Sequence, residues 1–63
     1  MTADEIKSLR DRLGLSQTAM AVRIGVSVDA LRKYEYGIRF PSNRVILRLR
    51  EIEAEALAKG VTA

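Results

Sequence analysis

The side chains best suited to contacting another molecule lie in the segment 27–36. Leu31 and Tyr34 are three residues apart and define the buried side of a helix there. At about 100° per residue, the opposite side carries Val28, Asp29, Arg32, Lys33 and Tyr36. A helix whose exposed face carries donors and acceptors from its N-terminus is of the kind that enters a DNA major groove. Charged outer faces are also ordinary on solvated helices, so this face alone leaves both interpretations open.

The distribution of charge favours an anionic partner. The chain has 63 residues and a net charge of +3. Residues 23–50 contain seven cations and two anions, a balance of +5, whereas the remainder contains four cations and six anions, a balance of −2. A basic middle suits a surface that faces phosphate. It is also compatible with solubility alone.

Two short helices position this face. Ser16 and Ser27 are of the type that caps helix N-termini, and Gly25 and Gly37 are of the type that ends helices in the left-handed conformation. The three residues between the helices allow only a steep crossing. The segment 16–36 therefore has the pattern of a helix-turn-helix unit.

The N-terminal segment predicts a third helix. Thr2 and Glu5 have the spacing of a capping box, and the helix they open extends to Leu13, with Gly14 after its last residue. Arg10 lies at the edge of its apolar stripe, which is unexpected for a charged residue. An exposed arginine there would contribute only ~0–1 kcal/mol through a surface ion pair.

The segment after Gly37 predicts a loop and a long helix, 42–59. The residue before Pro41 is kept out of the helical region, so Arg39 stands in an extended loop, suited to a phosphate or the adjacent minor groove. Ser42 caps the helix, and the first backbone N–H groups of that helix can bind a phosphate. Neither Gly nor Pro interrupts the chain between Ser42 and Gly60.

The motif SQTAMAVRIGVS, followed by Leu31, YEYG and Pro41, resembles the phage-repressor and Cro-like (XRE-type) helix-turn-helix family. The matching positions are Ser16, Gln17, Ala21, Gly25, Val26, Ser27, Tyr34, Glu35, Gly37 and Pro41, with Met20 where the family usually has Leu. The resemblance covers roughly residues 6–50. It implies an all-α, lambda-repressor-like domain of four helices, the last one long. Family members commonly end this helix earlier and add a fifth.

The resemblance also implies roles for individual residues. Base edges are expected to be read by Val28, Asp29, Arg32 and Lys33. Arg32 or Lys33 suits guanine O6 and N7, Asp29 can accept from cytosine N4, and Val28 can contact a thymine methyl group. DNA phosphates are expected to be bound by Gln17, Arg23, Tyr36, Arg39, Ser42 and Arg44. In the family, an arginine at the place of Arg10 pairs with the glutamate at the place of Glu35, which is a structural role.

We expect a single domain, 1–63, that forms a homodimer on a palindromic operator. A helix of 18 residues spans about 27 Å, more than we expect a three-helix body to cover, so the excess around Ile52–Leu57 would pack on a second copy. The alternatives are that this helix frays or folds back on the first helix.

Three classes of function compete. An enzyme is least favoured, because the chain has no His or Cys, and its carboxylates occur singly or on a solvated helix without a paired acid–base constellation. No metal, cofactor or small-molecule ligand is expected. A small protein-interaction module, antitoxin-like or an assembly partner, would account for the long helix and for Asp29, an anion on the DNA-facing side. Best supported is a sequence-specific double-stranded DNA-binding transcriptional regulator, a repressor, that reads the major groove with the helix 27–36. No apolar run approaches the ~20 residues of a membrane span, so we expect a cytoplasmic, nucleoid-associated protein.

Overall fold

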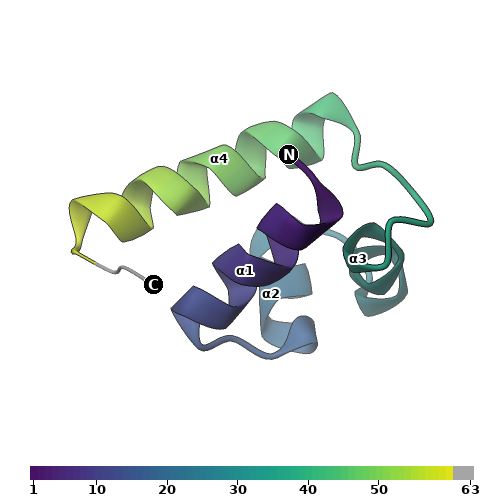
Figure 1. The fold of residues 1–63 in the computed structure, drawn as a ribbon, viewed down its shortest axis with the longest axis horizontal. Coiled ribbons are helices and arrows are strands. Elements are labelled where there is room, and N and C mark those ends of the chain that lie inside the picture. Colours follow the sequence, from purple (N-terminus) through teal and green to yellow (C-terminus); the bar gives the residue numbers. More distant parts are fainter. Residues whose placement is uncertain (61–63) are drawn as a thin grey trace.

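The computed structural model describes residues 1–60, and residues 61–63 lie outside the described part. Four helices follow one another along the chain: α1 (Ala3–Leu13), α2 (Gln17–Ile24), α3 (Val28–Glu35) and α4 (Asn43–Ala58). The described chain contains no strand, so the predicted all-α fold with a long last helix is confirmed. Figure 1 shows α4 along one edge of the molecule, above α1 and α2. In the same view α3 lies below the N-terminal end of α4.

A hydroxyl side chain caps the start of every helix. The hydroxyl oxygens of Thr2, Ser16, Ser27 and Ser42 each accept from the backbone N–H three residues further on, at 3.1–3.4 Å. At α1 the cap is reciprocal, because Glu5 accepts from the Thr2 N–H at 2.9 Å. Each bond satisfies a donor that the helix leaves without a partner, which is why the helix starts could be predicted.

The turn between α2 and α3 holds the two helices in contact. Gly25 has φ +74°, and its N–H donates to the carbonyls of Ala21 and Val22. The Val26 N–H donates to the Ala21 carbonyl at 3.0 Å, so the chain reverses within three residues. Ala21 is buried where α2 lies against α3.

All four helices contribute to one hydrophobic core. Its members are Ile6, Leu9, Met20, Ala21, Ile24, Leu31, Tyr34, Val45, Leu49 and Ile52. The side chains of Ile6, Met20, Leu31 and Leu49 are completely buried. None of the helices in residues 1–60 is long and apolar enough to cross a membrane.

The expectation that Ile52–Leu57 extends beyond the body was wrong for two of its residues. Ile52 and Ala56 are 4% and 6% exposed within this one chain. The 16 residues of α4 span about 24 Å, and the molecule is itself 31 Å long. Glu53 pairs with Arg12 of α1 at 3.9 Å, so α4 lies against α1, as in the alternative of a helix folded back on the first. Leu57 remains 58% exposed.

Candidate nucleic-acid interface

Helix α3 has one buried and one exposed side. Leu31 and Tyr34 are 0% and 6% exposed, whereas Asp29, Arg32 and Lys33 face solvent. Val28 does not share that exposure. It is partly buried and packs against the core, because it precedes Leu31 by three residues and so lies at the border of the buried face. The expectation that Val28 points into solvent is corrected accordingly.

Two of the predicted base-reading residues are paired with each other. The Lys33 ammonium lies 3.1 Å from the Asp29 carboxylate, one turn along the helix, and both side chains are well exposed. Such a pair stabilises a helix by only about 0.3–0.5 kcal/mol, so it can open at little cost when another partner offers a better contact. Within residues 1–60 Arg32 makes no ion pair, which leaves it as the unneutralised cation of this face.

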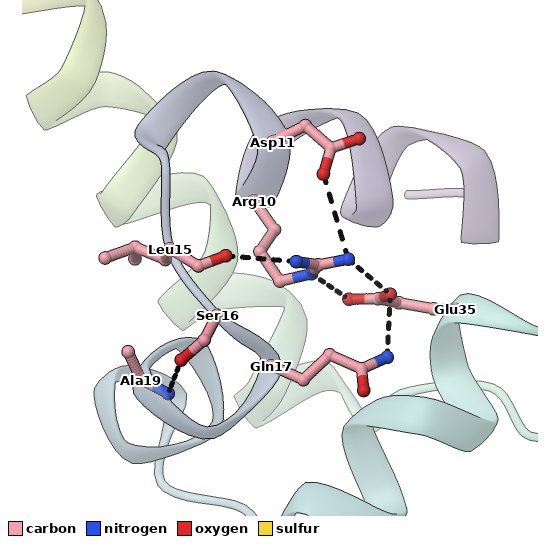
Figure 2. Close-up of polar contacts among 7 residues, drawn as sticks. All are labelled: Arg10, Asp11, Leu15, Ser16, Gln17, Ala19 and Glu35. Atoms are coloured by element: carbon pink, nitrogen blue, oxygen red, sulfur yellow. Dashed lines mark hydrogen bonds and ion pairs between the residues drawn. The ribbon is translucent and has the colours of Figure 1, made fainter.

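The C-terminal end of α3 is held by a buried ion pair. Arg10 of α1 donates from Nε to Glu35 Oε2 at 2.7 Å and from Nη2 to Glu35 Oε1 at 3.2 Å. Its Nη1 donates to the Leu15 carbonyl at 3.0 Å, as Figure 2 shows. The Glu35 side chain is 3% exposed, and the hydrogen bond to Glu35 raises the pKa of Arg10 above its usual range. The structure thus brings together the two residues that the resemblance paired.

Gln17, at the start of α2, completes this cluster. Its amide Nε2 donates to Glu35 Oε1 at 3.3 Å, so Glu35 accepts from both α1 and α2 (Figure 2). Three helices are therefore joined at one carboxylate, which fixes the C-terminal end of α3 against the rest of the unit. Gln17 was expected to contact a phosphate, and in the structure its side-chain nitrogen is directed inward instead.

The Leu15 carbonyl is a partner of Arg10 that sequence reasoning missed. The Leu15 N–H donates to the Arg10 carbonyl at 3.2 Å, so the turn after Gly14 brings this residue back over the arginine. A left-handed glycine directly after a helix was the available signal, because such a turn reverses the chain onto the last helical turn.

The remaining candidates for phosphate contacts fall into two groups. Tyr36, Arg39 and Ser42 are exposed around the connection from α3 to α4, and Arg44 is exposed in the first turn of α4. Arg23 differs from them. Its guanidinium lies 3.3 Å from Glu55, and its carbonyl accepts from Arg48 Nε at 3.1 Å, so its charge is turned toward α4.

Two large apolar side chains flank Arg39. Ile38 is 72% exposed and Phe40 is 88% exposed. Helical periodicity cannot identify such residues because they lie outside any helix; the only signal was the extended conformation that Pro41 imposes on Phe40. They follow the C-terminal end of α3 in the chain and are exposed residues that the sequence prediction did not include.

Within residues 1–60, no group of three or more His, Cys, Asp or Glu residues has the arrangement of a metal site.

The contacts described above place α3 on a helix-turn-helix unit, with its polar side exposed and its C-terminal end held through Glu35. That combination defines a class of helical domains that place one helix against a larger partner.

Comparison with known proteins agrees with this class. The family model described as "Helix-turn-helix domain" matches residues 3–52, and the chain belongs to this family. The resemblance to the XRE type is consistent with that membership.

Three curated relatives come from species of Pyrococcus. A putative HTH-type transcriptional regulatory protein of Pyrococcus furiosus is 36% identical over 58 residues, covering 92% of this chain and 18% of the relative. Those of Pyrococcus abyssi and Pyrococcus horikoshii are each 39% identical, covering 89% and 90% of this chain. The chain spans 18% of the length of each relative. No solved structure matches it significantly.

Proposed function

We propose that this protein is a sequence-specific double-stranded DNA-binding transcriptional regulator that inserts α3 into the major groove. The observation that carries the proposal is the contrast between the two sides of α3. Its outer side exposes Asp29, Arg32 and Lys33, while its C-terminal end is held through Glu35 by two other helices. A helix that is both exposed and fixed can hold several side chains in register with base edges.

The names of the Pyrococcus relatives support the same role. On this proposal the base-reading residues are Val28, Asp29, Arg32 and Lys33, and the phosphate-binding residues are Tyr36, Arg39, Ser42 and Arg44. Gln17 and Arg23 would first have to release Glu35 and Glu55, to which their side chains are bonded. Arg10 and Glu35 have a structural role, because they lie behind the reading face. The protein is not an enzyme, and a DNA-bound role implies a cytoplasmic, nucleoid-associated location.

The regulatory output that we propose is repression by a homodimer on a palindromic operator. A two-fold dimer matches the symmetry of a palindrome. A protein bound across a promoter excludes other proteins from the same DNA, so repression needs no further contact.

The salt dependence of duplex binding tests this proposal. If the basic middle of the chain binds phosphates, log K should fall linearly with log salt, with a slope of about −0.9 for each phosphate neutralised. Selection of bound duplexes from a random library should in addition yield one consensus. An absence of duplex binding at low ionic strength would contradict the proposal and favour the protein-interaction module. A salt slope without a consensus would contradict base reading.

A further inference from the structure

Asp29 is an anion on the side of α3 that would enter the groove, where DNA phosphates repel negative charge. The structure neutralises this anion within its own helix. Asp29 Oδ2 lies 3.1 Å from Lys33 Nζ, one turn further along α3. The two side chains are 69% and 46% exposed, so the carboxylate oxygen and the ammonium nitrogen are presented to solvent together, as a pair without net charge.

This pair holds an acceptor and a donor about one hydrogen-bond length apart, and one edge in the major groove has the complementary arrangement. In a C·G base pair the N4 amino group of cytosine donates to O6 of guanine, so the two atoms lie about 2.9 Å apart. N4 also offers a donor to the major groove, and O6 offers an acceptor. The carboxylate of Asp29 can accept from N4 while the ammonium group of Lys33 donates to O6, without any opening of the ion pair.

The groups on either side of these two atoms distinguish C·G from the other base pairs. Guanine offers a second acceptor, N7, beside O6, and an ammonium group has three donors with which to bind both. In an A·T pair the N7 acceptor of adenine lies on the side of the carboxylate, and the methyl group of thymine takes the place beside the ammonium. In the reversed pairs, G·C and T·A, an acceptor faces the carboxylate. C·G is therefore the base pair that fits an Asp–Lys pair.

We propose that Asp29 and Lys33 act as one unit that reads a single C·G base pair, with Asp29 on the cytosine and Lys33 on the guanine. The inference rests on the proposed function and deepens it, because it assigns one base pair of the site that α3 would read. It also accounts for the anion on the DNA-facing side, which otherwise favours a protein-interaction module. Arg32 makes no ion pair within residues 1–60, so it acts independently of this unit.

Base-pair scanning of the selected consensus tests whether the two residues share one base pair. Each position is changed in turn to the other three base pairs, and fluorescence anisotropy gives the affinities of the parent protein, Asp29→Ala and Lys33→Ala. At one C·G position the parent should discriminate by about tenfold or more, and both variants should lose most of that discrimination. Arg32→Ala is the control and should keep it. Relaxation of two different positions by the two variants, or of none, would overturn the proposal.

Two further measurements separate a shared contact from two independent ones. The double variant should lose about as much discrimination at that position as either single variant, whereas additive losses would overturn the proposal. Replacing the guanine by 7-deazaguanine, which carries C–H in place of N7, should weaken binding of the parent but not of Lys33→Ala. An equal loss for both proteins would overturn the assignment of Lys33 to guanine.

The outcomes distinguish this inference from the function on which it rests. A parent protein that selects no consensus contradicts the proposed function itself. A parent protein that selects a consensus, but whose specificity is unchanged in Asp29→Ala, contradicts only the paired reading. Circular dichroism checks that the variants remain helical, which is expected because both substituted side chains are exposed.

Discussion

Glu35 is a buried carboxylate whose charge is balanced from outside its own helix. The Arg10 side chain that neutralises it is itself only 15% exposed, so both charges have left water. Burying such a pair costs desolvation energy that the hydrogen bonds must offset. The pair therefore contributes chiefly by holding α3 in one place, and removing one partner should be far more damaging than its net contribution suggests.

Arg10→Ala tests this at the level of folding. The change leaves the Glu35 carboxylate buried and without its cation, which should cost about 3 kcal/mol and lower the melting temperature by about 12–24 °C in so small a domain. Thermal unfolding followed by circular dichroism gives the shift. Lys7→Ala is the control, because Lys7 is an exposed cation on the same helix. Equal stability of the two variants would show that the pair does not hold the helices together.

Lys33 and Arg39 carry the same charge but are expected to do different work. Lys33 lies on the exposed face of α3, beside Asp29, and Arg39 lies in the connection beyond it. Lys33→Ala should cost ~1–3 kcal/mol on the preferred duplex and much less on scrambled DNA. Arg39→Ala should weaken binding to both duplexes by similar factors and reduce the salt slope by about one unit.

Fluorescence anisotropy with the two duplexes, at several salt concentrations, separates these outcomes. If both variants lose the same affinity on both duplexes, α3 does not read bases. The reading face would then have to lie elsewhere, and Arg44, Arg48 and Arg50 of α4 would be the next residues to substitute.

The reciprocal hydrogen bonds between Thr2 and Glu5 at the start of α1 predict how the stability of the protein depends on pH. The backbone hydrogen bond from Thr2 holds the pKa of Glu5 below its ordinary value of 4.5. Because the folded pKa is the lower one, the contribution of this cap is complete above pH 4.5 and is lost as the pH falls through the folded value. Glu5→Gln keeps an acceptor oxygen but does not titrate. Its melting temperature should therefore change less than that of the parent between neutral and acidic pH. Parallel curves for the two proteins would contradict the prediction.

Helix boundaries were predictable because their determinants are local. Thr2, Ser16, Ser27 and Ser42 each act on a backbone group three residues away, and residues so close in sequence meet in any helix. The inward direction of Gln17 and the burial of Ile52 depend on distant residues. The first requires the position of Glu35 on another helix, and the second requires the path of α1 beneath α4, neither of which helical periodicity contains. The Arg10–Glu35 pairing came from resemblance to a family rather than from spacing.

The proposed homodimer predicts the layout of the DNA site that it would bind. Two copies related by a two-fold axis would present two α3 helices to one face of the duplex. The half-sites should then be inverted repeats about 10–10.5 base pairs apart, or a multiple of this spacing. A duplex in which five base pairs are inserted between the half-sites should bind with the affinity of a single half-site, because the second α3 then faces the opposite side of the DNA. Gel-shift titrations of both duplexes measure this. Unchanged affinity on the inserted duplex would show that the protein binds as a monomer.

The contacts that hold Glu35, which we call the Glu35 clamp, have a consequence for how the sequence of such a protein can change over evolution. Every contact of that clamp lies on the inner side of α3, at Arg10, Leu15 and Gln17. Within residues 1–60, Asp29, Arg32 and Lys33 are not part of the core, and the one ion pair among them joins Lys33 to Asp29. Exposed positions of this kind tolerate substitution within about 0.5 kcal/mol of stability. If α3 reads bases as proposed, its three exposed residues can be exchanged for others that recognise a different DNA sequence while the helices that hold α3 in place are left intact.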